Sequence, residues 1–236
     1  DFRIYVVDSQ NYRVQVFNRD LEYLFSIGGS QLLSHGGGSC DLPMNSAWGV
    51  TVVRTVISQQ VRVMVSDVQS HSIQVFTDEG QFLFRFGTKG RSRGQFVHPC
   101  GITATNSGEV LVCDRFNCRV QVFDAENGSF LAEYSPGLSL LHGPCAIHYH
   151  SDAVNERVIV GSIESSSIQV LDYRSNRWPY RRLYTSSATT AVEAATYDSS
   201  AEGVTTMATT SDGSSLTAAA VTTRRALPPL FQNSCT

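Results

Sequence analysis

Val14-Gln15-Val16-Phe17 is the first of four copies of one phrase; the others are Ile73-Gln74-Val75-Phe76, Val120-Gln121-Val122-Phe123 and Ile168-Gln169-Val170-Leu171. Their first residues are separated by 59, 47 and 48 positions. Each phrase alternates apolar and polar residues, with the two-residue period of a strand that has one covered face. Recurrence at a spacing of this size predicts supersecondary units that stack on one another.

The third copy shows the organisation of one unit. Four short strands are predicted, at 101–104, 110–113, 119–123 and 130–134. Between the last two strands, Asn127-Gly128 supplies the positive-φ residues of a tight hairpin turn. Four strands joined by short turns predict one antiparallel sheet.

The remaining copies follow the same order. The second copy predicts strands at 48–53, 61–66, 72–76 and 82–86, and the fourth at 145–149, 157–161 and 167–171, without a recognisable outer strand. The first copy begins at 4–7, with no inner strand before it. No stretch has the pattern of a useful amphipathic helix, so the predicted class is all-β.

A four-stranded sheet repeated every ~40–50 residues is a propeller blade, and propellers close with about 4–8 blades. The chain predicts an incomplete propeller, about four blades of an expected six. We expect the missing blades to lie upstream of Asp1, because the sequence starts in mid-blade. A strand from the amino end of a closed ring would then complete the fourth blade.

Two sets of residues resemble NHL repeats, the propeller module of the TRIM-NHL (tripartite motif) family. The first is 86–102, whose order of Phe-Gly, Gly, Gly-Gln-Phe, Pro and Gly-Ile resembles the family's inter-blade linker. The second is Asp114, Asn117 and Arg119 followed by the phrase 120–123, which resembles the repeat's central signature. The first copy repeats this signature, whereas the second and fourth depart from it. The resemblance covers residues 1–183.

The resemblance implies a carboxy-terminal, non-catalytic recognition module of a ubiquitin ligase or post-transcriptional regulator. Family members carry a RING finger, B-boxes and a coiled coil ahead of the propeller, and this sequence has neither paired Cys-x-x-Cys elements nor heptads. Ligase activity and oligomerisation would therefore belong to segments missing here. No catalytic residue, metal or cofactor is expected in this chain.

The candidate binding site is a basic loop with an aromatic neighbour. Because propellers carry function on loops at one rim, the predicted RNA- or partner-binding residues are Lys89, Arg91, Arg93, His98, Arg115 and Phe116. Cations of this kind pair with phosphates, and Phe116 and Tyr12 could stack on unpaired bases. The alternative is that these cations are simply solvated and that Phe116 packs under its own turn. The expected partner is single-stranded RNA or a protein.

Two pairs recur in phase within the repeat. Asp8 with Arg13, and Asp114 with Arg119, occupy equivalent positions. An ion pair that also hydrogen-bonds the turn explains such recurrence. We expect a structural role for these four residues.

Charge and composition separate the chain into two regions. Residues 1–183 carry 16 basic and 17 acidic residues, which argues against indiscriminate binding to nucleic acid or an anionic membrane. In residues 184–236, Ser, Thr and Ala make up 30 of 53 positions. Such a tail cannot bury enough apolar surface to offset its ordering entropy, so it is predicted to be disordered.

Cysteines and histidines bear on the compartment and on the alternative function. The six cysteines lack zinc-ligand spacing and fit reduced, packed thiols, although a disulfide between Cys100 and Cys145 stays open. With no leader or membrane span visible, a cytoplasmic protein is expected. The alternative is an extracellular metal-dependent lyase or ligand-sensing propeller that uses His98 and His142, which stand in corresponding linkers.

Overall fold

The computed structural model describes residues 2–29, 44–137, 141–152 and 154–173, together with the backbone of three later strands at 181–187, 204–207 and 217–222. The described residues form strands joined by short turns, with 3-10 turns at Ser9–Asn11 and Arg115–Asn117. None of the helices in this part of the chain is long and apolar enough to cross a membrane.

The strands form four sheets, which correspond to the four copies of the repeat. In spatial order, sheet 1 contains β16 (Val204–Met207), β17 (Thr217–Thr222), β1 (Arg3–Asp8), β2 (Arg13–Asn18) and β3 (Tyr23–Gly28). Sheet 2 contains β4 (Ala47–Arg54), β5 (Val61–Asp67), β6 (Ser72–Thr77) and β7 (Phe82–Phe86). Sheet 3 contains β8 (Pro99–Ala104), β9 (Glu109–Asp114), β10 (Arg119–Asp124) and β11 (Phe130–Tyr134). Sheet 4 contains β12 (Pro144–Ser151), β13 (Glu156–Ser162), β14 (Ser167–Asp172) and β15 (Arg181–Ser187).

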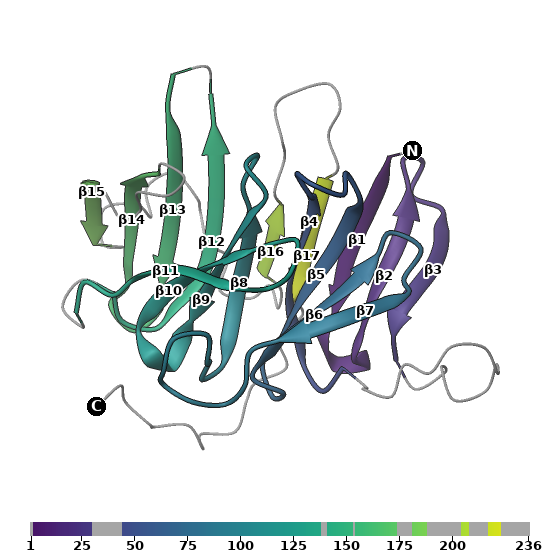
Figure 1. The fold of residues 1–236 in the computed structure, drawn as a ribbon, viewed down its shortest axis with the longest axis horizontal. Coiled ribbons are helices and arrows are strands. Elements are labelled where there is room, and N and C mark those ends of the chain that lie inside the picture. Colours follow the sequence, from purple (N-terminus) through teal and green to yellow (C-terminus); the bar gives the residue numbers. More distant parts are fainter. Residues whose placement is uncertain are drawn as a thin grey trace.

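The sheets follow one another in chain order, with sheets 1 and 4 at opposite ends of the row (Figure 1). Inner strands of successive sheets contact each other, β4 with β8 and β8 with β12. Within each repeat the strands pair antiparallel, as the turn chemistry predicts. The all-β propeller predicted from the repeats is confirmed.

Both ends of the repeat array involve strands that the pattern does not reveal. The outer strand of sheet 4 is β15, which pairs antiparallel with β14. On sheet 1, β17 pairs in parallel with β1, at the place where an inner strand was missing. The expected boundary at residue 183 falls inside β15, and β16 and β17 lie within the tail that was predicted to be disordered. The other residues of the tail lie outside the described residues.

The core lies in three layers between the sheets. Tyr5 and Val65 belong to the layer between sheets 1 and 2, and Phe96 and Met64 to the layer between sheets 2 and 3. A third layer, which includes Tyr173, fills the space between sheets 3 and 4. A single sheet therefore has no core of its own, because its apolar side chains are covered only by its neighbours.

The glutamine of the repeated phrase is buried, although a strand with one covered face would expose it to solvent. Gln74, Gln121 and Gln169 are 2%, 0% and 0% exposed, so both faces of β6, β10 and β14 are covered at these positions. A buried amide requires hydrogen-bond partners. The polar residue of the phrase therefore belongs to an internal network, not to a solvated face.

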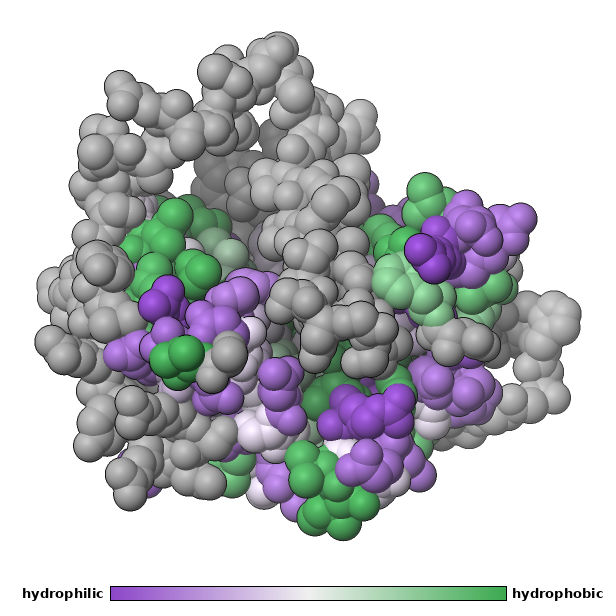
Figure 2. Space-filling model, turned by 90° about the horizontal axis from the view of Figure 1, so that it is seen from above, coloured by the Kyte–Doolittle hydropathy of each residue, from purple (hydrophilic) through white to green (hydrophobic). Residues whose placement is uncertain are grey.

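The two rims of the sheet row differ in their loops. The upper rim in Figure 1 includes the turns between β4 and β5 and between β12 and β13, where Ile57 and Val154 are 82% and 87% exposed. Figure 2, which views the molecule from above, shows separate hydrophobic patches among hydrophilic residues. The lower rim carries the linker between β7 and β8 and the turns that follow β1, β5, β9 and β13 (Figure 1).

Candidate functional site

Two loops of the lower rim are joined by backbone hydrogen bonds. The linker from β7 to β8 accepts through the carbonyl oxygens of His98 and Val97, which bind the N–H groups of Arg115 and Phe116 at 3.3 and 3.1 Å. The Asn117 amide adds a bond to the Gly90 carbonyl at 2.9 Å. The predicted site residues of these two loops are therefore held on one rigid surface.

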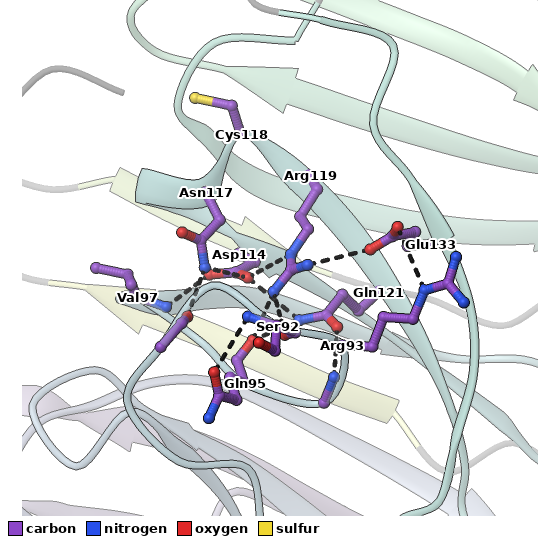
Figure 3. A network of polar contacts seen from close by, with 12 residues as sticks. Ser92, Arg93, Gln95, Val97, Asp114, Asn117, Cys118, Arg119, Gln121 and Glu133 are labelled. Carbon is purple, nitrogen blue, oxygen red and sulfur yellow. Dashed lines mark hydrogen bonds and ion pairs between the residues drawn. The ribbon is translucent and has the colours of Figure 1, made fainter. Parts of the chain in front are cut away.

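Asp114 organises this surface from beneath (Figure 3). Its carboxylate accepts hydrogen bonds from the Val97 N–H at 2.7 Å, from the Asn117 amide at 2.8 Å and from the Arg119 Nε at 2.8 Å. Gln121 donates a fourth at 3.2 Å. Because the Asp114 side chain is fully buried, each of these bonds replaces water that the carboxylate lost on folding.

Arg119 connects the same carboxylate to the linker. Its Nη2 donates to the carbonyl oxygens of Ser92 and Gln95, both at 2.8 Å, and its Nη1 lies 3.1 Å from the Glu133 carboxylate. The guanidinium is only 8% exposed. Its geometry is that of an internal clamp on the linker, and Arg119 offers little surface to a partner.

The equivalent positions of the other sheets show how the clamp varies. In sheet 1, Arg13 Nε lies 2.9 Å from the Asp8 carboxylate in a more exposed pair. In sheet 2, Asp67 accepts from Ser70 and Gln74, without an arginine. Sheet 4 has Ser162 in place of the acid.

That replacement leaves two buried groups unsatisfied. The Ser162 hydroxyl and the Gln169 Nε2 lack a hydrogen-bond partner within the described part of the chain. Gln169 keeps one bond, from the Tyr134 hydroxyl to its Oε1 at 3.1 Å. The departure from the repeat signature in sheet 4 therefore has a structural cost.

The predicted cations differ in their exposure and in whether an acidic side chain lies beside them. Arg93 is 73% exposed and turns toward the outer strand, 3.7 Å from Glu133 and with its Cζ 5.7 Å from the Phe130 ring centre. Arg115 pairs with Glu164 of sheet 4, through Nη2 at 2.8 Å and Nε at 3.2 Å. Lys89 and Arg91 are exposed on the linker.

His98, Arg115 and Phe116 lie together. The His98 ring meets the Phe116 ring edge-on at 4.6 Å, and the Arg115 Cζ lies 5.2 Å from the Phe116 ring centre. Phe116 is half-buried in this stack. The His98 and Phe116 rings thus form an aromatic surface beside the Arg115 guanidinium.

His71 is a member of this group that the sequence reasoning missed. It follows β5 in sheet 2, and its Nδ1 accepts the His98 N–H at 3.2 Å while the two rings lie 5.2 Å apart. His71 holds the left-handed position of its turn, as Tyr12, Cys118 and Ser166 do in the other sheets, with φ between 45° and 56°. Alignment of the four turns would have placed it on this rim, although not against His98. We call His71, Lys89, His98, Arg115 and Phe116 the rim cluster.

Burial and nearby charges lower the pKa of both imidazoles. Burial, reinforced by the nearby charges of His71, Arg115 and Lys89, lowers the pKa of His98 to about 4. Burial and Lys89 also lower the pKa of His71, against the opposing effect of Asp67. At neutral pH both rings are therefore uncharged donors and acceptors inside a positive field.

The histidines proposed for a metal do not form a ligand set with acidic or thiol groups. No group of three or more His, Cys, Asp or Glu side chains suited to a metal occurs among the residues described. The Gly143 carbonyl oxygen accepts from the Ile163 N–H at 3.1 Å, which parallels the bond between His98 and Arg115 in sheet 3, so His142 stands one position before the equivalent of His98. The two linkers thus correspond in structure, as their sequences suggested.

The cysteines follow the expectation in part. Cys100, Cys113 and Cys145 carry reduced thiols, so Cys100 and Cys145 are not bonded to each other. Burial raises the pKa of Cys100 to about 12, which makes its thiol unreactive. Cys118, at the left-handed turn position, is disulfide-bonded and departs from the expectation of reduced thiols.

Comparison with known proteins agrees with the repeat. The family model "NHL repeat" matches residues 96–123, which include the linker end, the Asp114 turn and β10. The chain is a β-propeller that contains an NHL repeat. Two relatives are "Protein brain tumor" of Drosophila melanogaster, 26% identical over 122 residues, and "Tripartite motif-containing protein 2" of Homo sapiens, 38% identical over 56 residues. These matches cover 51% and 24% of this chain.

The chain spans only 11% and 7% of the lengths of these relatives. Solved structures extend the likeness of fold. U3-55K and a virginiamycin B lyase from Staphylococcus aureus each give a TM-score of 0.50, at 11% and 14% identity. They cover 73% and 74% of this chain, which covers 45% and 51% of theirs. At these identities the likeness concerns the fold alone.

Proposed function

We propose that this NHL propeller is a non-catalytic recognition module that binds a macromolecular partner through the rim cluster. The observation that carries the proposal is the convergence of cationic and aromatic side chains from two sheets. The Asp114 and Arg119 network holds their loops in place. Preorganised loops on a rigid scaffold reduce the entropy lost on binding.

The charge pattern favours a protein as the partner. Arg115 and Arg93 already face Glu164 and Glu133, so the rim offers mixed charges and aromatic edges, not a continuous basic track. The whole chain has a formal net charge of −3. Aromatic and arginine side chains beside paired charges are the composition of protein interfaces.

Single-stranded RNA is the second candidate, because Lys89 and Arg91 are exposed on either side of Gly90. Tyr12, on the rim of sheet 1, is 51% exposed and has the form of a stacking platform. In either case we propose that the full-length protein acts in the cytoplasm as a TRIM-NHL-like ubiquitin ligase or post-transcriptional regulator. The propeller would select the target, and ligase activity would come from segments beyond this sequence.

The test compares two charge reversals of equal size. Lys89→Glu with Arg91→Glu alters the rim, whereas Arg19→Glu with Arg85→Glu alters exposed cations elsewhere. Quantitative affinity capture compares the proteins bound by each variant with those bound by the unaltered chain. Proteins that the unaltered chain captures should be lost from the rim variant and kept by the control variant. Filter binding to uridine-rich RNA over a salt series tests the second candidate. Equal capture and equal RNA binding by both variants would refute recognition at this rim.

The lyase or ligand-sensing alternative remains a separate prediction. It would require a metal held by His98 and His142. Elemental analysis of the purified chain for zinc, calcium and iron tests it. A stoichiometric metal that is lost in a His142→Ala variant would favour the alternative over recognition.

A further inference from the structure

His98 has a backbone conformation that its own side chain does not favour. Its φ is +61°, in the left-handed region. The equivalent residue of the next linker, also directly before a proline, is Gly143, with a φ of +62°. Glycine adopts this conformation without steric cost, whereas a side chain makes it unfavourable. The backbone alone therefore gives no reason for histidine at this position, and strained side chains of this kind gather at functional sites.

The histidine pair also has a defined polarity. Because His71 Nδ1 accepts the His98 N–H, the proton of neutral His71 is on Nε2. That nitrogen is a donor held in orientation by the neighbouring sheet. The pair thus offers a fixed donor at the junction of sheets 2 and 3.

Two cations act on the histidine pair, although Asp67 opposes them at His71 and Glu164 already pairs with Arg115. Lys89 acts on both imidazoles and Arg115 acts on His98, which is why each cation lowers the pKa of the ring it faces. An anion placed here would reduce this repulsion. Such an anion gains both charge-assisted hydrogen bonds and relief of like-charge strain.

The chain itself shows which anion this rim accepts. Arg115 holds the Glu164 carboxylate, which comes from the equivalent turn of sheet 4. A Cβ added to Gly143 would collide with that same carboxylate, so glycine gives Glu164 the room to reach Arg115. In sheet 3 the corresponding space belongs to His98. At the linker before sheet 4 this space holds the Glu164 carboxylate, and at the linker before sheet 3 it holds the His98 imidazole.

We propose that His98, His71 and Lys89 form a subsite, beside the Arg115–Glu164 pair, for a carboxylate group in an acidic segment of a protein partner. The inference rests on the proposed recognition function and narrows its partner class. The His71 Nε2–H, the ring N–H of neutral His98 and the Lys89 ammonium are the proposed donors, and the Phe116 ring is the apolar wall.

The experiment separates a ligand role of His98 from a structural one. The probe is a fluorescent peptide of alternating glutamate and glycine, and its matched control has glutamine for glutamate. Binding is followed by anisotropy for the unaltered chain and for His98→Gly, Lys89→Gln and His150→Ala. His150 is an exposed histidine of β12 and gives the control variant.

The unaltered chain should prefer the glutamate peptide, and His98→Gly should weaken that binding by about tenfold, the effect of losing hydrogen bonds to a charged group. His98→Gly should melt no lower than the unaltered chain, because glycine suits the backbone there. Lys89→Gln should also weaken binding, and His150→Ala should not. Loss of affinity without loss of stability is a result that a structural role does not give.

Three results would overturn the subsite. The first is equal affinity for the two peptides or no binding of either, and the second is unchanged binding by His98→Gly. The third is that His98→Gly weakens the binding of uridine-rich RNA but not of the glutamate peptide, which would assign the site to nucleic-acid phosphate. If rim-dependent capture of proteins persists in any of these cases, the recognition function stands and only the subsite fails.

Discussion

Asp114 and Asp8 hold the same position in two copies of the repeat, yet replacement by alanine should affect them very differently. The Asp114 side chain is fully buried and its partner Arg119 is 8% exposed. The Asp8 side chain is 19% exposed and Arg13 is 37% exposed. The two variants remove the same group from the same local motif, so the difference between them measures burial.

The magnitudes follow from what each variant leaves behind. Asp114→Ala leaves the buried Arg119 guanidinium without this carboxylate and leaves the Val97, Asn117 and Gln121 donors without their shared acceptor. Breaking a buried pair in this way costs about 3–5 kcal/mol. Asp8→Ala opens a partly solvated pair, for which about 1 kcal/mol is expected.

Urea unfolding and thermal melting measure both variants. For a domain of this size, ~1 kcal/mol corresponds to about 2–4 °C, so Asp114→Ala should lower Tm by about 6–20 °C and Asp8→Ala by about 2–4 °C. Limited proteolysis should also cut the 88–97 linker faster in Asp114→Ala. Equal losses of stability in the two variants would refute the assignment of the Asp114 network as the buried clamp of the linker.

Three further outcomes are expected. Gly101→Ala would place a Cβ 2.7 Å from a carbonyl oxygen of the next sheet and should cost about 1–3 kcal/mol in urea unfolding, whereas Gly161→Ala, with 3.5 Å to its nearest neighbour, should be near neutral. Ser162→Asp should stabilise the chain by about 1 kcal/mol, because it gives the unpartnered Gln169 Nε2 an acceptor; a lower Tm would contradict this. Since the pKa of folded His98 is about 4, the unfolded chain binds more protons between roughly pH 6.5 and 4, so the free energy of unfolding should fall as pH falls through that window. The His98→Gly variant should lose about 1–2 kcal/mol less between pH 7 and 4.5, a figure discounted for partial exposure, and identical pH profiles would exclude this origin.

Much of the fold could be predicted from the repeated phrase. The alternation in 73–76 and 120–123, and the Asn127-Gly128 turn, are local patterns, and strands with hairpin turns depend mostly on neighbours within one repeat. The sheets predicted from these patterns are the sheets observed. By contrast, β15 and β17 carry no such phrase. β15 is recognised only by its pairing with the preceding strand β14, and β17 by its pairing with β1 from the opposite end of the chain.

The site was predictable only in its parts. The sequence by itself determined the repeat, the blade strands and which loops share a rim, because these follow from periodicity and turn residues. Only the tertiary structure decided that His71 meets His98, 27 positions away, and that Arg115 meets Glu164, 49 positions away. Both contacts cross from one sheet to the next, and the packing of whole sheets sets them, because no sheet can bury its apolar faces without its neighbours.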